Sequence, residues 1–206
     1  MPRQTPVRLR LAASYVAFTA LVLTAAGFFF WRYLKADAEM HTQTALDPDW
    51  GATVGYLHFD NARPEWQYDR SDPEEADTVK RLRHVFLLAD QNGNVLESST
   101  TFASVGLDTP QMRVFVERTL NAPTRTAEYS IRKDKGGTPY LIRAGWTRDD
   151  HDRKYFLAIG RSLAIPYRAT DRFLETYFLL ALLTLLIASW LSWWLTGVAI
   201  QQGRTT

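Results

Sequence analysis

The sequence predicts an α+β domain, with a mostly antiparallel sheet and flanking helices, inserted between two transmembrane helices. Two long uncharged runs lie near the ends of the 206-residue chain, and short segments between them alternate between strand and helix patterns. All 22 Asp and Glu residues fall between Asp37 and Glu175. This sorting of charge excludes a single soluble domain, and an aromatic content of 13% excludes a disordered chain.

The first uncharged run, Leu11–Trp31, has 21 residues and follows Arg3, Arg8 and Arg10. As a helix it would span roughly 31 Å, about one hydrocarbon core. The alternatives are an uncleaved membrane anchor and a cleaved signal peptide. The run exceeds the ~7–15 apolar residues of a typical signal peptide, and the bulky segment Phe28–Trp31 is no small-residue cleavage site. Both features favour the anchor.

The second run follows Glu175 and stays uncharged to Gly203. Because basic tails remain in the cytoplasm, the chain is expected to cross twice, with both ends inside. The predicted parts are listed in chain order: a cytoplasmic basic tail at 1–10, a first span at 11–31, an extracytoplasmic domain at 32–172, a second span at 173–197 and a cytoplasmic stub at 198–206.

Small residues recur along the first span at a four-three spacing and so share one helix stripe, at Ala13, Ala17, Ala20, Thr24 and Gly27. A shorter stripe in the second span consists of Thr184, Ala188 and Ser192. Such stripes let helix backbones approach closely, which suggests a homodimer through the transmembrane helices. The alternative is that small residues are simply common in membrane helices.

The first half of the domain is expected to contain two helices and two short strands. The first helix should continue to Leu46 and end at Asp47-Pro48-Asp49, because the residue before a proline avoids the helical region. Segments 56–59 and 66–68 are typical of a hairpin or of two short strands. Ser71 and Glu74 form a capping-box pattern that predicts a helix to about Arg83.

Five strands and two helices should follow. The continuous apolar run 84–89 predicts a strand covered on both faces, and a turn at 90–94 leads into a second strand at 95–99. Thr109 and Pro110 predict the start of a helix to about Leu120. Segments around 127–132, 140–146 and 155–159 alternate as three meander strands, and a helix from about Thr170 enters the second span.

Three stretches resemble the sensing half of a bacterial two-component sensor histidine kinase. They are the basic start with the first span, the strand-turn-strand segment Val85–Ser99, and Tyr155–Leu163 with the following span up to Trp193-Trp194-Leu195. The second is similar to an element of PAS-like sensor domains, and the third to the entry of a HAMP linker. The resemblance implies a PAS-like fold and a location in the bacterial inner membrane.

The resemblance stops after the second span. HAMP entries usually continue with basic residues and a proline, but residues 196–206 contain one arginine, Arg204, and no proline, and no phosphoacceptor helix or ATP-binding domain follows. His41, His58, His84 and His151 all lie on the sensor side, so no kinase residue carries over. We therefore expect a receptor module truncated before its HAMP and kinase domains, with no catalytic residue and no cofactor.

A ligand-binding site is expected on the meander strands. Arg132 and Arg143 lie mid-strand, where they could bind a carboxylate, and Tyr140 and Trp146 could line a pocket with them. The alternative for the aromatic residues, including Trp66 and Tyr68, is a place in the core. Lys80, Arg81 and Arg83 cluster at a helix end and suggest an anionic ligand or lipid head group, or simply favourable interaction with the helix dipole.

Other kinds of site are disfavoured. The segment Asp149–Asp152 offers metal-ligand types but fits a solvated hairpin turn better. The histidines and Met112 show no paired ligand spacing, and cysteine is absent, so no metal site is expected. No nucleophile elbow, phosphate loop or HExxH motif occurs. The acidic middle and the membrane anchors disfavour nucleic-acid binding.

The sequence therefore predicts a membrane-anchored extracytoplasmic sensor module whose stimulus is an unknown small ligand or protein, with the lipid bilayer as a partner. The alternative is a membrane-anchored structural or assembly protein whose domain binds another protein.

Overall fold

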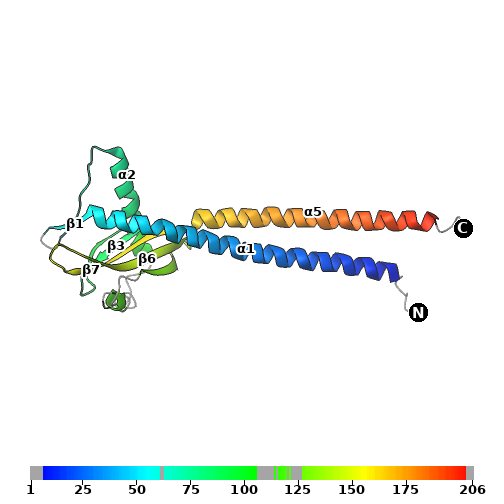
Figure 1. The fold of residues 1–206 in the computed structure, drawn as a ribbon, viewed down its shortest axis with the longest axis horizontal. Helices are drawn as coiled ribbons and strands as arrows, with labels where there is room; N and C mark the ends of the chain where they lie inside the picture. The colour runs from blue at the N-terminus through cyan, green and yellow to red at the C-terminus, as the bar shows by residue number, and fades with distance from the viewer. Residues whose placement is uncertain are drawn as a thin grey trace. The chain divides into compact units, whose positions relative to one another are not determined.

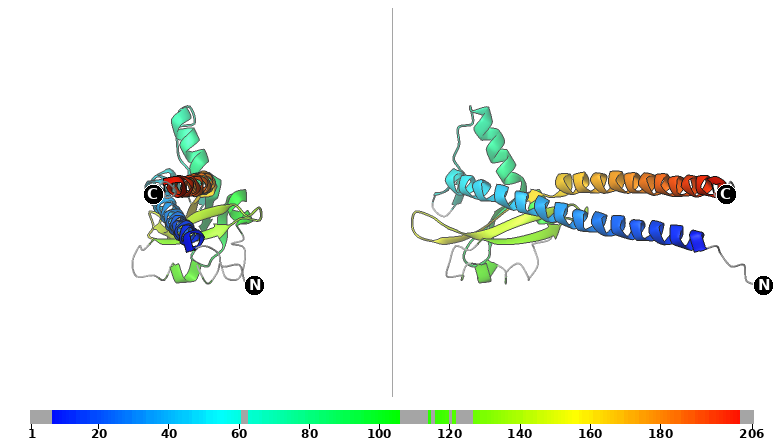
Figure 2. Two further views of the ribbon diagram at one scale, coloured as in Figure 1. Left: turned by 90° about the vertical axis from the view of Figure 1, so that its right-hand side faces the viewer. Right: turned by 45° about the vertical axis from the view of Figure 1, so that its right-hand side comes forward.

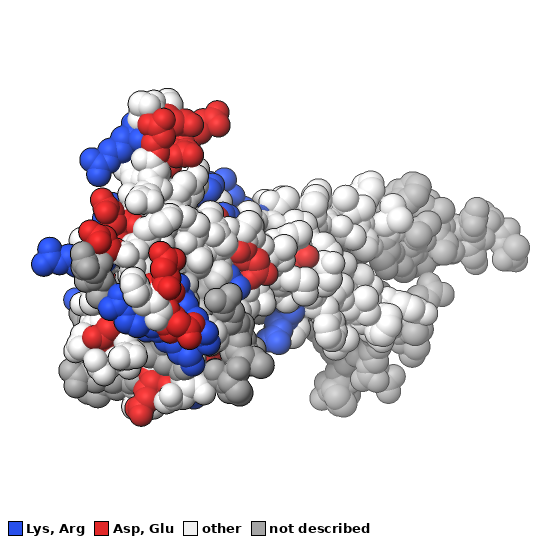
Figure 3. Space-filling model, turned by 60° about the vertical axis from the view of Figure 1, so that its left-hand side comes forward, with Lys and Arg blue, Asp and Glu red and all other residues white. Residues whose placement is uncertain are grey.

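The computed structural model describes residues 7–60, 63–105, 114, 116–119, 121 and 127–202, with side chains between residues 13 and 191. The chain forms two compact units. We call Met1–Ala36 with Tyr167–Thr206 the helical pair, and Asp37–Pro166 the central domain. Charged side chains of both signs gather on the central domain, whereas the described surface of the helical pair is mostly uncharged (Figure 3).

The helical pair consists of the first part of helix α1 (Val7–Tyr56) and most of helix α5 (Ala164–Gln202). The two segments run antiparallel side by side (Figures 1 and 2). Both helices are long and apolar enough to cross a membrane, and their apolar stretches are hardly buried within the protein. The predicted spans 11–31 and 173–197 lie inside these helices.

One close contact fixes the register of the helical pair. The Tyr177 hydroxyl donates a hydrogen bond to the Leu23 carbonyl over 2.7 Å, and Gly27 is buried beneath the same ring. A Cβ atom at Gly27 would lie 2.5 Å from Tyr177 Cε1, so a larger residue there would force the Tyr177 ring to shift. Part of the predicted small-residue stripe thus packs inside the chain, whereas Ala13, Ala17 and Thr24 remain exposed.

Helix α1 continues to Tyr56, so the predicted end at Asp47-Pro48-Asp49 is wrong. Pro48 lies inside the helix, where it removes one backbone hydrogen bond. The helix continues because its next turns are buried in the central domain, with Leu46 and Thr53 both 0% exposed. Tertiary packing therefore overrides the local preference of the Asp-Pro sequence.

The predicted pair of short strands after α1 is confirmed as a separate two-stranded sheet of β1 (Leu57–Asp60) and β2 (Arg63–Trp66), but β2 begins before the predicted strand 66–68 and ends at Trp66. Helix α2 (Pro73–Leu82) follows, but its cap differs from the predicted capping box. Asp72 accepts a hydrogen bond from the Glu74 backbone N–H at 2.8 Å, while Ser71 bonds to Asp69. Asp72, directly before Pro73, is closer than Ser71 to the free N–H groups of the first helical turn. It therefore caps the helix in place of Ser71.

The main sheet is antiparallel and has five strands in the order β4-β3-β7-β6-β5. A short 3-10 turn at Arg83–Val85 leads into the fully buried strand β3 (Phe86–Ala89), and β4 is Val95–Ser98. The meander strands are β5 (Glu128–Lys133), β6 (Pro139–Arg148) and β7 (Lys154–Ser162). The α+β class and the five predicted strands are confirmed, except that His84 and Val85 of the predicted strand 84–89 belong to the 3-10 turn.

Alternation along the strands gives the sheet two different faces. One face carries the main apolar core, which includes Phe102 from helix α3 (Thr100–Ser104) and Ile142 and Phe156 from the sheet. The opposite face lies under the second part of α1 (Figure 1). Of the helix predicted at 109–120, the first residues lie outside the described part of the chain, while Val114 and 116–119 are helical.

Candidate functional site

The sheet separates the four residues that the sequence suggested as ligand contacts. Tyr140 and Trp146 alternate with Arg143 on β6, so they lie on opposite faces. Tyr140 is 8% exposed, and Trp146 packs against the main core. Arg132 lies on the edge strand β5, paired with Tyr140. These residues therefore do not line one common cavity.

Arg143 instead belongs to a cluster beneath α1. Its guanidinium lies 4.5 Å from the centre of the Trp50 ring, and Nε is 3.4 Å from Asp47 Oδ1. Nε and Nη1 are buried and make no hydrogen bond to the described residues. Tyr129, the cross-strand partner of Arg143, donates a 2.6 Å hydrogen bond to Asp47. Burial and this hydrogen bond raise the pKa of the Tyr129 hydroxyl.

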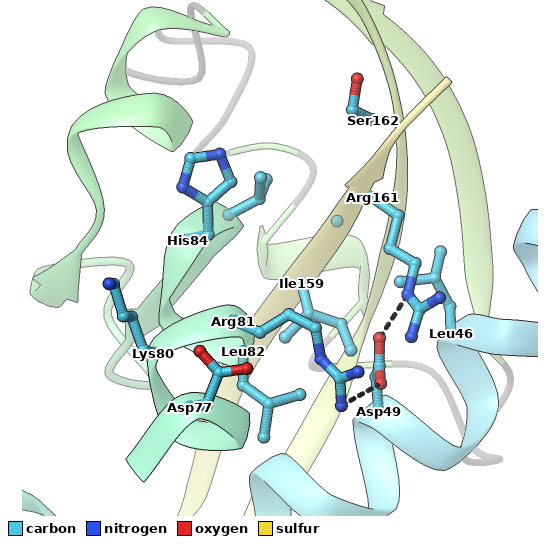
Figure 4. A pocket seen from close by; sticks show the side chains of 12 residues that line it. Leu46, Asp49, Asp77, Lys80, Arg81, Leu82, His84, Ile159, Arg161 and Ser162 are labelled. Carbon is cyan, nitrogen blue, oxygen red and sulfur yellow. Dashed lines mark hydrogen bonds and ion pairs between the residues drawn. The ribbon is translucent and has the colours of Figure 1, made fainter. Parts of the chain in front are cut away.

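A larger feature on the same face is a cavity of about 510 Å³ between α1, α2 and β7 (Figure 4). This volume falls within the ~300–1,000 Å³ range of small-molecule sites. The cavity combines a hydrophobic floor with a charged rim. Its lining consists of Leu46, Asp49, Asp77, Lys80, Arg81, Leu82, His84, Val85, Ile159, Gly160, Arg161 and Ser162.

Asp49 of α1 occupies the centre of the charged rim, between an arginine of β7 and an arginine of α2 (Figure 4). Its Oδ2 accepts a 2.5 Å hydrogen bond from Arg161 Nε, and its Oδ1 lies 3.9 Å from Arg81 Nη2. The Asp49 side chain is 11% exposed, whereas that of Arg81 is 60% exposed. Arg161 is thus held firmly, and Arg81 only loosely.

The remaining charged groups of the rim come from α2 and the turn after it. Lys80 and His84 are four residues apart and extend along the same wall, with Asp77 near Arg81 (Figure 4). Neither Lys80 nor His84 forms an ion pair with any described residue. The charges of Arg81 and Arg161 balance those of Asp49 and Asp77. Lys80 therefore gives the rim a net positive charge even when His84 is neutral.

The basic cluster predicted at the end of α2 is divided by the structure. Lys80 and Arg81 line the cavity, but Arg83 forms a 2.8 Å ion pair with Glu97 and lies over the Trp66 ring. Trp66 also donates to Glu97 and contacts Phe86, which gives it a structural role in covering the sheet.

The Asp149–Asp152 segment forms the tight turn between β6 and β7. Asp149 accepts hydrogen bonds from the backbone N–H groups of His151 and Arg153 and from the Arg153 side chain. Burial acts to raise the pKa of Asp149, but these hydrogen bonds outweigh it and lower the pKa overall. The described residues contain no group of three potential metal ligands.

Sequence reasoning did not find Asp49 or Arg161 as site residues. Asp49 was assigned to a helix stop, and Arg161 was part of an apolar strand segment. One signal was present in the sequence. Arg161 follows the apolar strand 155–159, and a charged side chain that points into the protein needs a partner. The partner lies 112 residues earlier in the chain, beyond any spacing rule.

Comparison with known proteins gives no family. No family model matches the chain, and a search of curated proteins finds no match. Among solved structures, the chain is similar to an RNA-binding light-oxygen-voltage receptor, at 10% sequence identity and a TM-score of 0.30. The similarity covers 85% of this chain and 70% of that receptor. A score this low does not establish a common fold.

Proposed function

We propose that this protein is the membrane-anchored, ligand-binding sensor module of a two-component receptor. In this proposal α1 and α5 cross a bacterial inner membrane, both termini lie in the cytoplasm, and the central domain is extracytoplasmic. The proposal assigns the chain reception of a stimulus and no catalytic step.

The arrangement of the chain supports the membrane part of the proposal. The central domain, Asp37–Pro166, is inserted between two helical segments that are long and apolar enough to span a bilayer. Core helices of soluble proteins also reach this length and apolarity, but they are buried, whereas these apolar stretches are almost entirely exposed. The basic residues Arg3, Arg8 and Arg10 support a cytoplasmic N-terminus.

The sheet supports a PAS-like assignment of the domain. Numbered along the chain, the five strands of the main sheet follow the order 2-1-5-4-3, so the first and last strands are neighbours at its centre. We assign this five-stranded antiparallel sheet with flanking helices to the PAS-like class that the sequence resembles. Strand β7 leads after Ser162 directly into α5, which begins at Ala164.

The cavity is the observation that carries the sensor function. Its walls come from α1, α2, the 3-10 turn after α2 and β7, and α1 is the same helix that contains the first apolar stretch. An occupant that displaces Asp49 from Arg81 or Arg161 acts directly on α1. A ligand with different affinity for two positions of α1 shifts the balance between them, which is the requirement for a receptor.

We further propose that the module functions as a homodimer. Ala13, Ala17 and Thr24 of α1 and Thr184 and Ala188 of α5 are exposed on the helical pair. Small residues on an exposed membrane face allow close approach of a second copy.

A chimaeric receptor tests the sensor function. Residues 1–202 would be fused to the HAMP and kinase domains of a receptor with a measurable autophosphorylation rate. Asp49→Asn should change that rate in membrane vesicles by about fivefold or more, because it removes the charge that holds Arg161. Glu65→Gln makes the same chemical change on the exposed strand β2 and should leave the rate unchanged.

An unchanged rate in the Asp49→Asn chimaera would contradict the sensor function. If a protein then co-purified stoichiometrically with the full chain, the alternative role as a membrane-anchored assembly protein would replace it.

A further inference from the structure

We infer that the cavity between α1, α2 and β7 binds a small organic anion, with an oxyanion head group on the Lys80–Arg81 wall and an apolar body on the hydrophobic floor. The inference names the class of stimulus for the proposed receptor. The role of this anion as a stimulus rests on the proposed sensor function. The binding of the anion itself rests only on the residues that line the cavity.

The charges of the rim favour an anion. Arg81, Lys80 and Arg161 face two carboxylates, Asp49 and Asp77. Asp49 is committed to Arg161 at 2.5 Å and reaches Arg81 only at 3.9 Å. Arg81 therefore retains most of its capacity to bind a carboxylate or phosphate oxygen, and its planar guanidinium can do so through two N–H groups.

Neighbouring positions on α2 add to this preference. Lys80 directly precedes Arg81, and His84 lies four residues further along, in the short turn before β3. All three side chains line the cavity from the same wall (Figure 4). The Arg81 guanidinium extends toward Asp49, whereas the Lys80 ammonium and the His84 ring lie on the other side of the wall, so an oxyanion can receive hydrogen bonds either from Arg81 or from Lys80 and His84 (Figure 4).

The hydrophobic floor of the cavity determines the chemical character of the rest of the ligand. Leu46, Leu82, Val85 and Ile159 form it, and each is at most 4% exposed, so the floor is fixed by the core of the domain. A bare oxyanion would fill only a small part of about 510 Å³. An aromatic or aliphatic body attached to the anionic head would occupy the remainder and lie against this apolar floor.

Fluorine NMR of the full chain in lipid nanodiscs tests the inference. The probes are para-fluorobenzoate, para-fluorophenyl phosphate and the neutral para-fluorobenzyl alcohol, with empty nanodiscs as the background. At least one anionic probe should bind saturably, and the alcohol should bind at least about tenfold more weakly. The better anion identifies the preferred head group.

Paired variants locate the binding. Lys80→Met and Arg81→Met together should weaken anion binding by about tenfold or more, because two charged hydrogen-bond donors are lost. Arg70→Met removes an exposed positive charge that does not line the cavity and should have no effect. Both altered side chains of the double variant are exposed, so the fold should be retained, as circular dichroism can verify.

Three results would overturn the inference: no saturable binding of either anion up to about 10 mM, equal binding of the alcohol, or equal binding by the double variant. These results are distinguishable from failure of the sensor function. Anion binding that leaves the chimaeric kinase unchanged would contradict the receptor role and leave the site standing. A chimaera that responds to Asp49→Asn without any anion binding would contradict the site alone.

Discussion

Asp49 of α1 and Arg161 of β7, 112 residues apart in the sequence, are joined by a 2.5 Å hydrogen bond between Oδ2 and Nε. Two positions earlier, Asp47 approaches Arg143 of β6 and accepts a hydrogen bond from Tyr129 of β5. The Asp-Pro-Asp segment therefore attaches α1 to three neighbouring strands of the sheet. The same segment carries one wall of the cavity.

The two aspartates should differ in their contributions to stability. Asp49→Asn should lower the free energy of unfolding of the central domain by about 2 kcal/mol, because it leaves the Arg161 charge without its partner. Asp47 is 56% exposed, so Asp47→Asn should cost less than about 1 kcal/mol. Urea unfolding of the full chain in detergent micelles, followed by tryptophan fluorescence, measures both. Equal losses of unfolding free energy in the two variants would contradict the larger contribution of Asp49.

Gly145 is required by the close approach of α1 to the sheet. A Cβ atom there would lie 2.9 Å from Trp50 Cη2, so Gly145→Val should destabilise the domain by about 1–3 kcal/mol. Gly51, one residue beyond Trp50, has nothing within 4 Å of its Cβ position. Gly51→Ala should therefore stabilise the domain by about 0.5–1 kcal/mol through helix propensity. The same unfolding assay compares them, and a stabilising Gly145→Val would refute the described contact.

Much of the fold can be predicted from local sequence patterns. Contacts between distant segments, such as that of Asp49 with Arg161, cannot be predicted in this way. Strand β5 alternates in polarity, and β3 and β7 contain continuous apolar runs, so these strands were predictable. The end of α1 was not, because Pro48 favours a stop locally and the burial of Leu46 and Thr53 outweighs it.

The candidate site was only partly predictable. Lys80 and Arg81 were visible as a basic cluster at a helix end. Arg143 was singled out with Tyr140 and Trp146, yet the period-two geometry of β6 places it on the other face. The pairing of Asp49 with Arg161 depends on how α1 packs over β7, and neither residue stands out in its own segment.

Stability should decrease on strong acidification because of the turn carboxylates. The folded state lowers the pKa of Asp149 below its unfolded value, as it does for Asp90 in the turn between β3 and β4. The resulting stabilisation is complete above the unfolded pKa of about 3.9 and is lost as the pH falls through the lower folded values.

Asp149→Asn should flatten this dependence. Urea titrations between about pH 5 and pH 2 should show a smaller loss of stability for the variant than for the wild type. Asp150→Asn is the matched control, since no hydrogen bond or ion pair joins its side chain to a described residue. Identical slopes for wild type and Asp149→Asn would show that Asp149 is not the responsible carboxylate.

The helical pair should depend on Gly27. Gly27→Leu should separate the helices, because Tyr177 occupies the space above this residue. Phe30 and Phe173 contact each other with ring centres 5.0 Å apart, and the chain has no cysteine, so Phe30→Cys with Phe173→Cys should be cross-linked within one chain by a short bifunctional maleimide. Gly27→Leu should abolish this cross-link, and the exposed neighbour Ala26→Leu should preserve it.

Labelling of single cysteines in intact cells tests the two-span arrangement most directly, since the natural chain contains no cysteine to interfere. A membrane-impermeant maleimide should label Arg70→Cys, on the exposed surface of the central domain, without permeabilisation. Thr5→Cys, in the basic tail, should react only after the membrane is permeabilised. The two-span arrangement is contradicted if Thr5→Cys reacts in intact cells while Arg70→Cys is protected.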